Sequence, residues 1–375
     1  MLLGIAAATL ACAASDATDW SEKAIQLYRA GHFSEAEAAY RRALDAYDRS
    51  GEGATLARAL TLENIAVMLR AEGRYAESAN LHLEALPRIE ELAGPDSLQA
   101  ARAASNLAAL YGSMGKVAEA EALAARAERV FGALPPGNGP EHSANQHVLA
   151  SIFVAQHRYA EAERLLRATL RDAHSVNTVV AYSNLAAASL GVNENVRAEE
   201  YARQAVALAQ SELRPGHPLA AVALNNLAQA CRFQGKNLEA ENSYREAISI
   251  WEHALGDRHP DLARGLMNLA AFYHDRGREA GAEDLYQRAG AIFEEALGSK
   301  SAEALVVHGE LADVLRAQRR YTEAEKLSRA TLAAMRGQFA AGDPRLLRAE
   351  GNDAHLRDEA HSGKAKREAK VAAFQ

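Results

Sequence analysis

The chain has 375 residues, of which 49% are hydrophobic and 24% charged, and its formal net charge is -7. This balance is typical of a folded soluble protein and argues against a disordered one. Binding to nucleic acid requires a concentrated basic face, so we do not expect a nucleic-acid partner for a chain whose acidic charge is spread along its length.

Residues 1–14, MLLGIAAATLACAA, form an apolar run without a charged side chain. The run has the length of the apolar part of a secretory signal and is too short to span a bilayer. Small residues at Ala11, Ala13 and Ala14 offer cleavage positions, and the residues up to Cys12 resemble a bacterial lipoprotein motif. We expect an exported protein, periplasmic or secreted, with Cys12 as a candidate lipid anchor. If the run is not a signal, the chain is cytoplasmic.

A regular frame of small residues and glycines begins near Asp19 and defines a first repeat that ends near Ser50. The residues that mark it are Trp20, Ala24, Leu27, Gly31, Ala36, Tyr40 and Ala43. This pattern predicts a helix, a turn that contains glycine, and a second helix.

The frame has a period of 42 residues, which is clearest between His217 and Gly298. His217, Asn226 and Gly235 recur in the next repeat as His259, Asn268 and Gly277. A fixed period of this size is the signature of a stack of supersecondary units, each resting on its neighbours.

About eight repeats fit this frame over residues 19–342. Most contain an asparagine directly before a hydrophobic residue and an alanine; these asparagines are Asn64, Asn106, Asn184, Asn226 and Asn268. Val148 and Glu310 take this position in repeats four and eight, and His157 replaces the turn glycine of repeat four. The array is irregular at 132–178, where a proline-rich connection and a six-residue deletion predict a hinge or a change of pitch.

The end of the array differs from its body. Asn352 lies 42 residues after Glu310, but the following leucine position is Asp353. We therefore expect a degenerate capping helix at 343–360, which solvates the end of the stack, and a flexible basic tail at 361–375.

Periodicity explains why each repeat should fold as two helices. Leu224, Leu227, Ala228 and Cys231 have the spacing of one apolar stripe on a helix. Pro218 and Pro260 suit the first turn of a helix, His217 and His259 suit its cap, and Gly235 and Gly277 suit a turn with positive φ. The sequence thus predicts an all-α stack of antiparallel helix pairs.

The pattern is identified as that of the tetratricopeptide repeat family, and the 42-residue repeats resemble those of kinesin light chains. The resemblance implies a right-handed superhelical solenoid. It also implies a protein-interaction scaffold whose concave groove binds an extended segment of a partner. The heptad region of kinesin light chains is absent, so a motor-adaptor role is not expected.

Asparagine is disfavoured inside helices, so its recurrence at one position needs a reason. One interpretation is that each amide bonds the neighbouring helix and pins the stack. The other is that it projects onto the concave surface and binds the main chain of a peptide, and the resemblance favours this second interpretation.

Carrying the frame through the chain gives a set of candidate peptide-binding residues. The set is Asn64, Asn106, Asn184, Asn225, Asn226, Gln229, Arg232, Phe233, Arg264, Asn268, His274 and Arg316. Its mixture of amides, cations and one aromatic residue suits an extended segment that is acidic or ends in a carboxylate.

No catalytic motif occurs in the sequence, and no cysteine and histidine cluster has the spacing of a metal site. We expect a non-enzymatic protein without a cofactor or metal. The sequence does not fix the oligomeric state, for which a monomer is the expectation. Two alternatives remain: a self-assembling structural component of the cell envelope, and a regulatory domain with a small-molecule pocket at the irregular middle.

Overall fold

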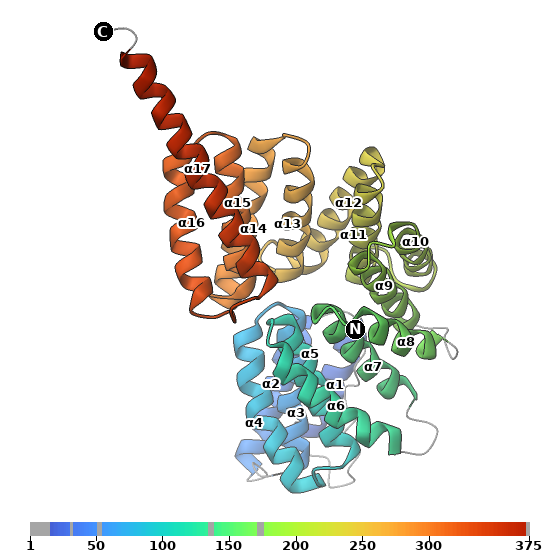
Figure 1. Ribbon diagram of the computed structural model, residues 1–375. Helices are drawn as coiled ribbons and strands as arrows, with labels where there is room; N and C mark the ends of the chain where they lie inside the picture. Colours follow the sequence, from blue (N-terminus) through green and yellow to red (C-terminus); the bar gives the residue numbers. More distant parts are fainter. Residues whose placement is uncertain (1–15, 31–32, 51–54, 134–138, 171–175, 373–375) are drawn as a thin grey trace. The chain divides into compact units, whose positions relative to one another are not determined.

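The structure is a computed structural model that describes residues 16–30, 33–50, 55–133, 139–170 and 176–372; side chains are described for 16–27, 35–49, 55–133, 139–170 and 176–359. Regular secondary structure in these ranges is helical (Figure 1). The helices are α1 (Asp16–Ala30), α2 (Phe33–Ser50), α3 (Leu56–Ala71), α4 (Tyr75–Ala93), α5 (Leu98–Ser113), α6 (Val117–Ala133), α7 (Gly139–Ala155), α8 (Tyr159–Thr169), α9 (Val176–Gly191), α10 (Asn195–Glu212), α11 (Pro218–Phe233), α12 (Asn237–Leu255), α13 (Pro260–His274), α14 (Glu279–Leu297), α15 (Ala302–Ala317), α16 (Tyr321–Arg336) and α17 (Pro344–Ala372).

The helices form two compact units, an N-terminal unit of residues 1–236 and a C-terminal unit of residues 237–375. Within each unit, consecutive helices pack against each other in the order of the chain. The predicted all-α solenoid of helix pairs is confirmed. The division between the units lies after Lys236. The hinge or change of pitch expected at 132–178 stays a prediction.

Histidine and proline together begin two of the helices. The Nδ1 atom of His217 accepts a hydrogen bond of 3.1 Å from the backbone N–H of Leu219, and His259 accepts one of 3.0 Å from Asp261. Pro218 occupies the first turn of α11, where a missing N–H costs nothing. The predicted capping role of these histidines is confirmed.

The turns within the repeats require a left-handed backbone. Gly235 and Gly277 have φ values of +74° and +68°, as predicted. Non-glycine residues adopt the same conformation in three repeats: His157 with φ of 61°, Asn193 with 61° and Arg319 with 64°. The register of the turn therefore persists where glycine is absent.

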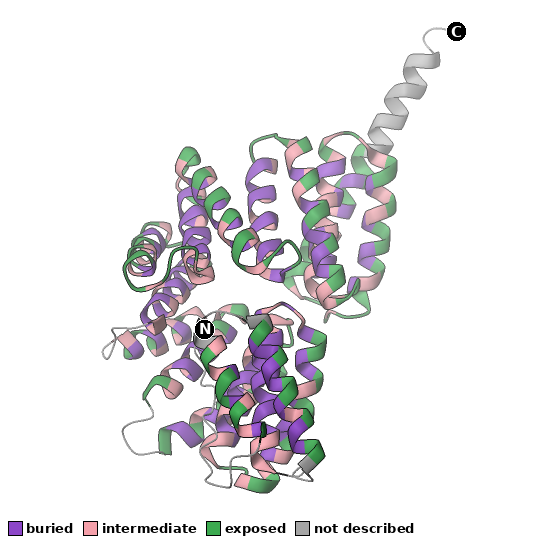
Figure 2. Ribbon diagram, turned by 180° about the vertical axis from the view of Figure 1, so that it is seen from behind, coloured by how far each residue is buried: buried purple, intermediate pink, exposed green. Residues whose placement is uncertain are grey.

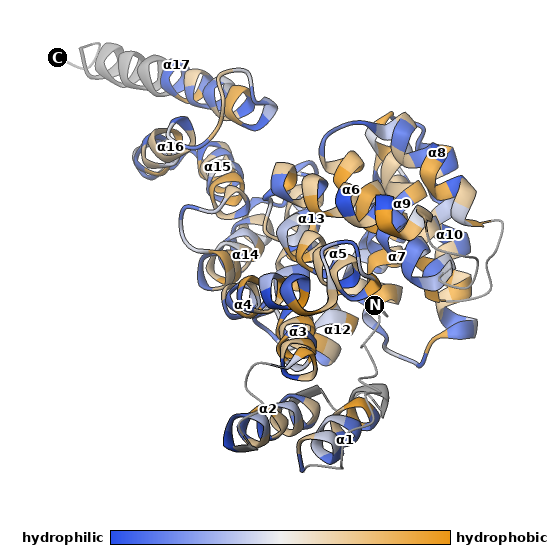
Figure 3. Ribbon diagram, turned by 90° about the horizontal axis from the view of Figure 1, so that it is seen from below, coloured by the Kyte–Doolittle hydropathy of each residue, from blue (hydrophilic) through white to orange (hydrophobic). Residues whose placement is uncertain are grey.

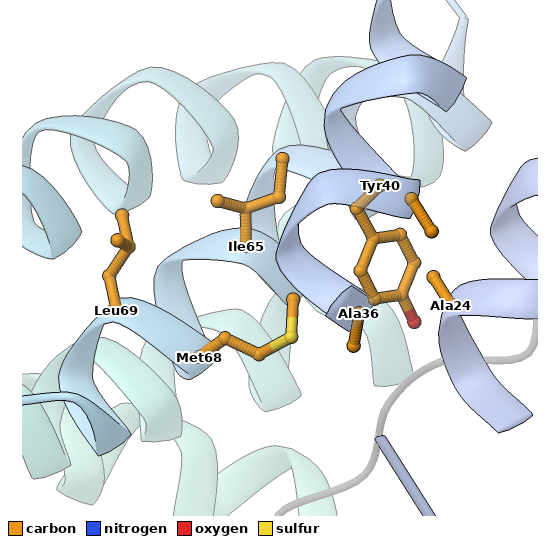
Figure 4. Packing of buried hydrophobic residues seen from close by; sticks show 7 residues of the cluster. Ala24, Ala36, Tyr40, Ile65, Met68 and Leu69 are labelled. Carbon is orange, nitrogen blue, oxygen red and sulfur yellow. The ribbon is translucent and has the colours of Figure 1, made fainter. Parts of the chain in front are cut away.

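Small residues between large ones form the core. In the first two repeats, Ala24 and Ala36 are fully buried beside Tyr40, Ile65 and Met68 (Figure 4). Hydrophobic and hydrophilic residues occupy different sides of the same helices (Figure 3), and buried residues lie where helices face their neighbours (Figure 2). Each apolar stripe is thus covered by the next helix of the stack.

A polar clamp, which the sequence did not reveal, ties an even-numbered helix to the turn that leads into the next even-numbered helix. Glu283 of α14 accepts hydrogen bonds from Gln318, 35 residues later, at 2.9 Å and from Arg320, 37 residues later, at 2.7 Å. The same spacing recurs in the pairs Glu37–Arg74, Glu121–Gln156, Glu121–Arg158, Glu199–Gln234, Glu199–Lys236 and Glu241–Arg278. Burial raises the pKa of Glu283, but Arg320 and Gln318 lower it below its ordinary value. We call this arrangement the glutamate clamp.

The helix at the end of the array differs in part from expectation. α17 occupies the predicted capping segment 343–360 but continues to Ala372, so residues 361–372 of the predicted tail are helical. Asp353 is buried, and its carboxylate accepts a 2.7 Å hydrogen bond from Ser328. The loss of the leucine at this position therefore creates a buried polar contact rather than a solvated face. Residues 373–375 lie outside the described residues.

The irregular middle is only partly described. α8 has 11 residues, whereas α6 has 17 and α10 has 18, so the deletion shortens this helix. The proline-rich connection at 134–138 and the residues 171–175 lie outside the described residues, as does the predicted leader at 1–14 with Cys12. No helix in the described ranges has both the length and the apolar character needed to cross a membrane.

The glutamate clamp makes a direct prediction. Glu283→Gln removes the negative charge of the carboxylate to which Arg320 and Gln318 both donate. We expect the free energy of unfolding, measured by urea titration of the full chain, to fall by about 1 to 2 kcal/mol. Glu325 occupies the same position one repeat later, and none of the described residues bonds to it. Glu325→Gln is therefore the control, with an expected change within about 0.5 kcal/mol. Equal losses in both variants would contradict the clamp.

Candidate functional site

From α3 onward, the odd-numbered helices of each unit form a row in which each helix contacts the next odd-numbered one of that unit. These contacts join α3, α5, α7, α9 and α11 in the N-terminal unit, and α13, α15 and α17 in the C-terminal unit. In a curved stack, the row with the closer spacing lies on the concave side. We call it the inner row. All residues of the predicted peptide-binding set lie on it.

The recurring asparagines bond along the inner row. Asn226 is 8% exposed, and its Nδ2 atom donates a 2.8 Å hydrogen bond to the carbonyl oxygen of Ser183 on α9. Asn184 donates in the same way to the carbonyl oxygen of His147 on α7, at 3.4 Å. Each acceptor directly precedes the corresponding position of the previous repeat. The nitrogen atoms of these amides thus pin the stack, as the first interpretation predicts.

The first asparagines bond to side chains instead. Asn64 donates to the hydroxyl of Tyr40 at 3.3 Å, and Asn106 donates to Glu63 at 3.0 Å. The other oxygen of Glu63 lies 2.7 Å from Nδ1 of His82, and both side chains are buried. Sequence reasoning missed Glu63 and His82. The only available signal was a charged residue at a position that holds serine in repeats three and five.

The oxygen atom of the Asn226 amide differs from its nitrogen. Among the described residues, none donates a hydrogen bond to the Oδ1 atom of Asn226. Its nitrogen is therefore used by the stack while its oxygen remains an acceptor. A peptide-binding role for Asn64, Asn106, Asn184, Asn226 and Asn268 stays a prediction; Asn268 is half-buried on α13.

The end of α11 presents a face of mixed chemistry. Asn226, Gln229 and Phe233 have the spacing of one helical face. Gln229 is half-buried, and Phe233 is 56% exposed, unusual for a large aromatic side chain. The guanidinium of Arg232 lies 5.3 Å from the centre of the Phe233 ring. Asn225, also predicted, is buried.

The neighbouring helix α9 supplies apolar residues at matching positions. Val180, Ala187 and Leu190 are half-buried and share one face of α9, and Val222 continues that face on α11. We define the α9–α11 strip as Val180, Ala187, Leu190, Val222, Asn226, Gln229 and Phe233. This strip combines hydrogen-bonding amides with accessible apolar side chains.

In the C-terminal unit, His274 lies between two carboxylates. Its Nδ1 atom is 2.6 Å from Glu279, and its Nε2 atom is 3.5 Å from Asp313. The hydrogen bond with Asp313 raises the pKa of His274, burial lowers it, and Glu279 raises it again, to about 9. The imidazole is therefore charged at neutral pH and joins α13, α14 and α15.

The two predicted arginines of this unit are paired as well. Arg316 binds Asp313 at 2.7 Å on its own helix and Glu359 of α17 at 2.9 Å. Arg264 binds Asp261 at 2.5 Å. Because acidic side chains of the chain already neutralise these cations, they give no support to the expectation of an acidic segment.

Two hollows in the structure bear on whether it could hold a small molecule. A cavity of about 10 Å³ between α15, α16 and α17 has the space of about one water molecule. A depression of about 420 Å³ near the irregular middle is lined by five residues that all belong to α8: Ala160, Glu163, Arg164, Arg167 and Ala168. It is an open surface rather than an enclosed small-molecule pocket.

Substitution of Asn226 tests the stacking role. Asn226→Ala loses the hydrogen bond to Ser183, and we expect the free energy of unfolding to fall by about 1 kcal/mol relative to Asn80→Ala. Asn80 is exposed on α4. Asn80→Ala therefore gains the same helix propensity as Asn226→Ala but loses no hydrogen bond to a neighbouring helix. Equal urea midpoints for the two variants would show that the bond contributes nothing.

His274 predicts a loss of stability in alkaline solution. Its pKa of about 9 in the folded state exceeds the value of about 6.5 in the unfolded chain. The stabilisation is complete below about pH 6.5 and disappears as the pH rises through about 9. We expect the urea midpoint of the wild type to fall over this range and that of His274→Gln to fall less. His253→Gln, at an exposed histidine of α12, should behave like the wild type.

Comparison with known proteins places the chain in a family. The family model described as Tetratricopeptide repeat matches residues 56–133, 177–253, 220–295 and 261–337, together more than half of the chain. A search of curated proteins gives no match.

Several solved structures are similar in fold. A Rap protein complexed with Competence and Sporulation Factor is 16% identical, with a TM-score of 0.55 over 94% of this chain and 98% of that one. The apo form of the quorum sensor NprR from B. thuringiensis is 15% identical, with a TM-score of 0.58 over 85% and 87%. Kinesin light chain repeats from Podosopora anserina are 24% identical, with a TM-score of 0.43 over 55% and 100%. With its repeated helix pairs and the matches of the family model, the chain belongs to the tetratricopeptide repeat family.

Proposed function

We propose that the protein is a non-enzymatic interaction scaffold that binds an extended segment of a partner protein on the inner row of its repeats. The observation that carries the proposal is the face of α11, where Asn226, Gln229 and the exposed ring of Phe233 lie together. Large exposed aromatic residues beside hydrogen-bonding amides are typical of protein-binding surfaces.

The chemistry of this face suits an extended main chain. Such a segment presents N–H and C=O groups that need partners once water is displaced. The Oδ1 atom of Asn226 can accept from an N–H, and the carboxamide of Gln229 can both donate and accept. Phe233 and the apolar residues of α9 can then cover alternate side chains of the segment.

Truncating this face should abolish binding without unfolding the chain. We expect the double variant Gln229→Ala and Phe233→Ala to lose at least about tenfold in affinity for the partner, because both side chains are accessible and contribute little to packing. Partners are captured with the immobilised full chain and identified, and the bound segment is then synthesised and titrated by calorimetry.

The matched control is the double variant Gln204→Ala and Leu83→Ala. Both side chains are exposed, on the even-numbered helices α10 and α4 of the same unit. The control should bind like the wild type, and both double variants should keep the wild-type helicity. If the control loses as much affinity as the α11 variant, the inner row is not the binding surface. Light scattering that shows self-association and no captured partner would favour an assembly role instead.

A further inference from the structure

The two helices of the α9–α11 strip are almost free of charge. α9 contains no aspartate, glutamate, lysine or arginine over Val176–Gly191, and in α11 the only such residue is Arg232. By contrast, α13 and α15 carry several charged residues on the inner row of the C-terminal unit. In the N-terminal unit, α5 and α7 are nearly as poor in charge, with Arg102 and Glu141 as their single residues of these types, so α9 and α11 continue a stretch of the inner row that carries little charge.

The accessible side chains of the strip are apolar or carry neutral amides. Val180, Ala187, Leu190 and Val222 are half-buried, so part of each apolar side chain remains open to contact. Phe233 is more than half exposed. A charged side chain placed against these four apolar residues would lose hydration, whereas an apolar one would gain by leaving water. A cation that the structure places beside the strip is Arg232, over the ring of Phe233.

The polar groups of the strip are suited to the main chain rather than to charged side chains. The Oδ1 atom of Asn226 and the carboxamide of Gln229 match amide groups, which every residue of a partner supplies. Three of the four cations that the sequence offered for carboxylates, Arg264, His274 and Arg316, lie in the C-terminal unit and are paired with acidic residues there. The fourth, Arg232, lies on α11, with its guanidinium over the ring of Phe233.

Resting on the proposed function, we infer that the α9–α11 strip binds an uncharged extended segment of a partner protein with apolar side chains at alternate positions. An extended chain places every second side chain on one face, which matches an apolar surface with hydrogen-bonding groups along it. This reverses the expectation of an acidic segment.

A peptide library tests the inference. Random 12-residue peptides displayed on phage are selected on the immobilised full chain, and the enriched sequences are read. We expect enrichment of uncharged sequences with apolar residues at every second position, and loss of enrichment on the Gln229→Ala and Phe233→Ala variant. Enrichment of acidic or basic sequences that depends on the same residues would overturn the inference but keep the proposed function. No enrichment at all would overturn the proposed function, and the inference with it.

Two substitutions on α9 sharpen the result. Ala187→Glu places a carboxylate on the strip, and we expect at least a tenfold loss of affinity for the selected peptide by fluorescence polarisation, whereas Ala187→Ser should stay within threefold of the wild type. Helicity and thermal unfolding are measured for each variant. If Ala187→Glu does not fold, Gln229→Glu places the charge on α11 instead. Unchanged affinity in a folded glutamate variant would overturn the inference.

Discussion

The close approach of helices within the stack depends on alanine at one position of every described repeat from the second to the eighth. The residues at this position are Ala66, Ala108, Ala150, Ala186, Ala228, Ala270 and Ala312, and their exposure is between 0% and 5%. A larger side chain there would force the backbones apart, because protein interiors have no spare volume. The small side chain at this position allows the close spacing that brings the asparagine two residues earlier within reach of the previous inner helix, as in the bond from Asn226 to Ser183.

Two polar systems act on opposite sides of this apolar layer. Glutamate clamps tie an even-numbered helix to the turn before the next one, through residues 35 and 37 positions further along the chain, as in Glu283 with Gln318 and Arg320. Amides tie the odd-numbered helices through contacts such as Asn226 to Ser183. Because one set acts on the outer row and the other on the inner row, each constrains the angle between consecutive repeats. Hydrophobic packing alone is non-directional and leaves this angle less well defined.

Local periodicity predicted most of the fold. Apolar stripes predicted the helices. His217, Pro218 and Gly235 predicted where α11 begins and ends, and the structure confirms this. The asparagine positions were also found, since they recur in a fixed frame. The clamps and the buried pair of Glu63 and His82 were missed because their partners lie 19 to 43 residues away and depend on the stacking itself.

The charge of the candidate site was harder still to predict. Arg264, His274 and Arg316 were visible as cations on one face, but their acidic partners come from several helices and from the end of the chain. A sequence shows which residues carry charge, whereas the net field of a surface depends on which charges the fold brings together. The neutral character of α9, in contrast, can be read directly from its residues.

In the proposed binding mode, the bond from Asn226 to Ser183 also lowers the entropic cost of binding a partner. A carboxamide is planar, so fixing its nitrogen on the carbonyl of α9 fixes the direction of its oxygen as well. A free side chain at an interface loses about 0.5 to 1.5 kcal/mol of rotamer entropy when it is immobilised. Here that loss occurs when the chain folds. If Asn226 binds a partner as proposed, its acceptor is therefore preorganised, and the main chain of the partner meets a hydrogen-bond partner whose orientation is already determined.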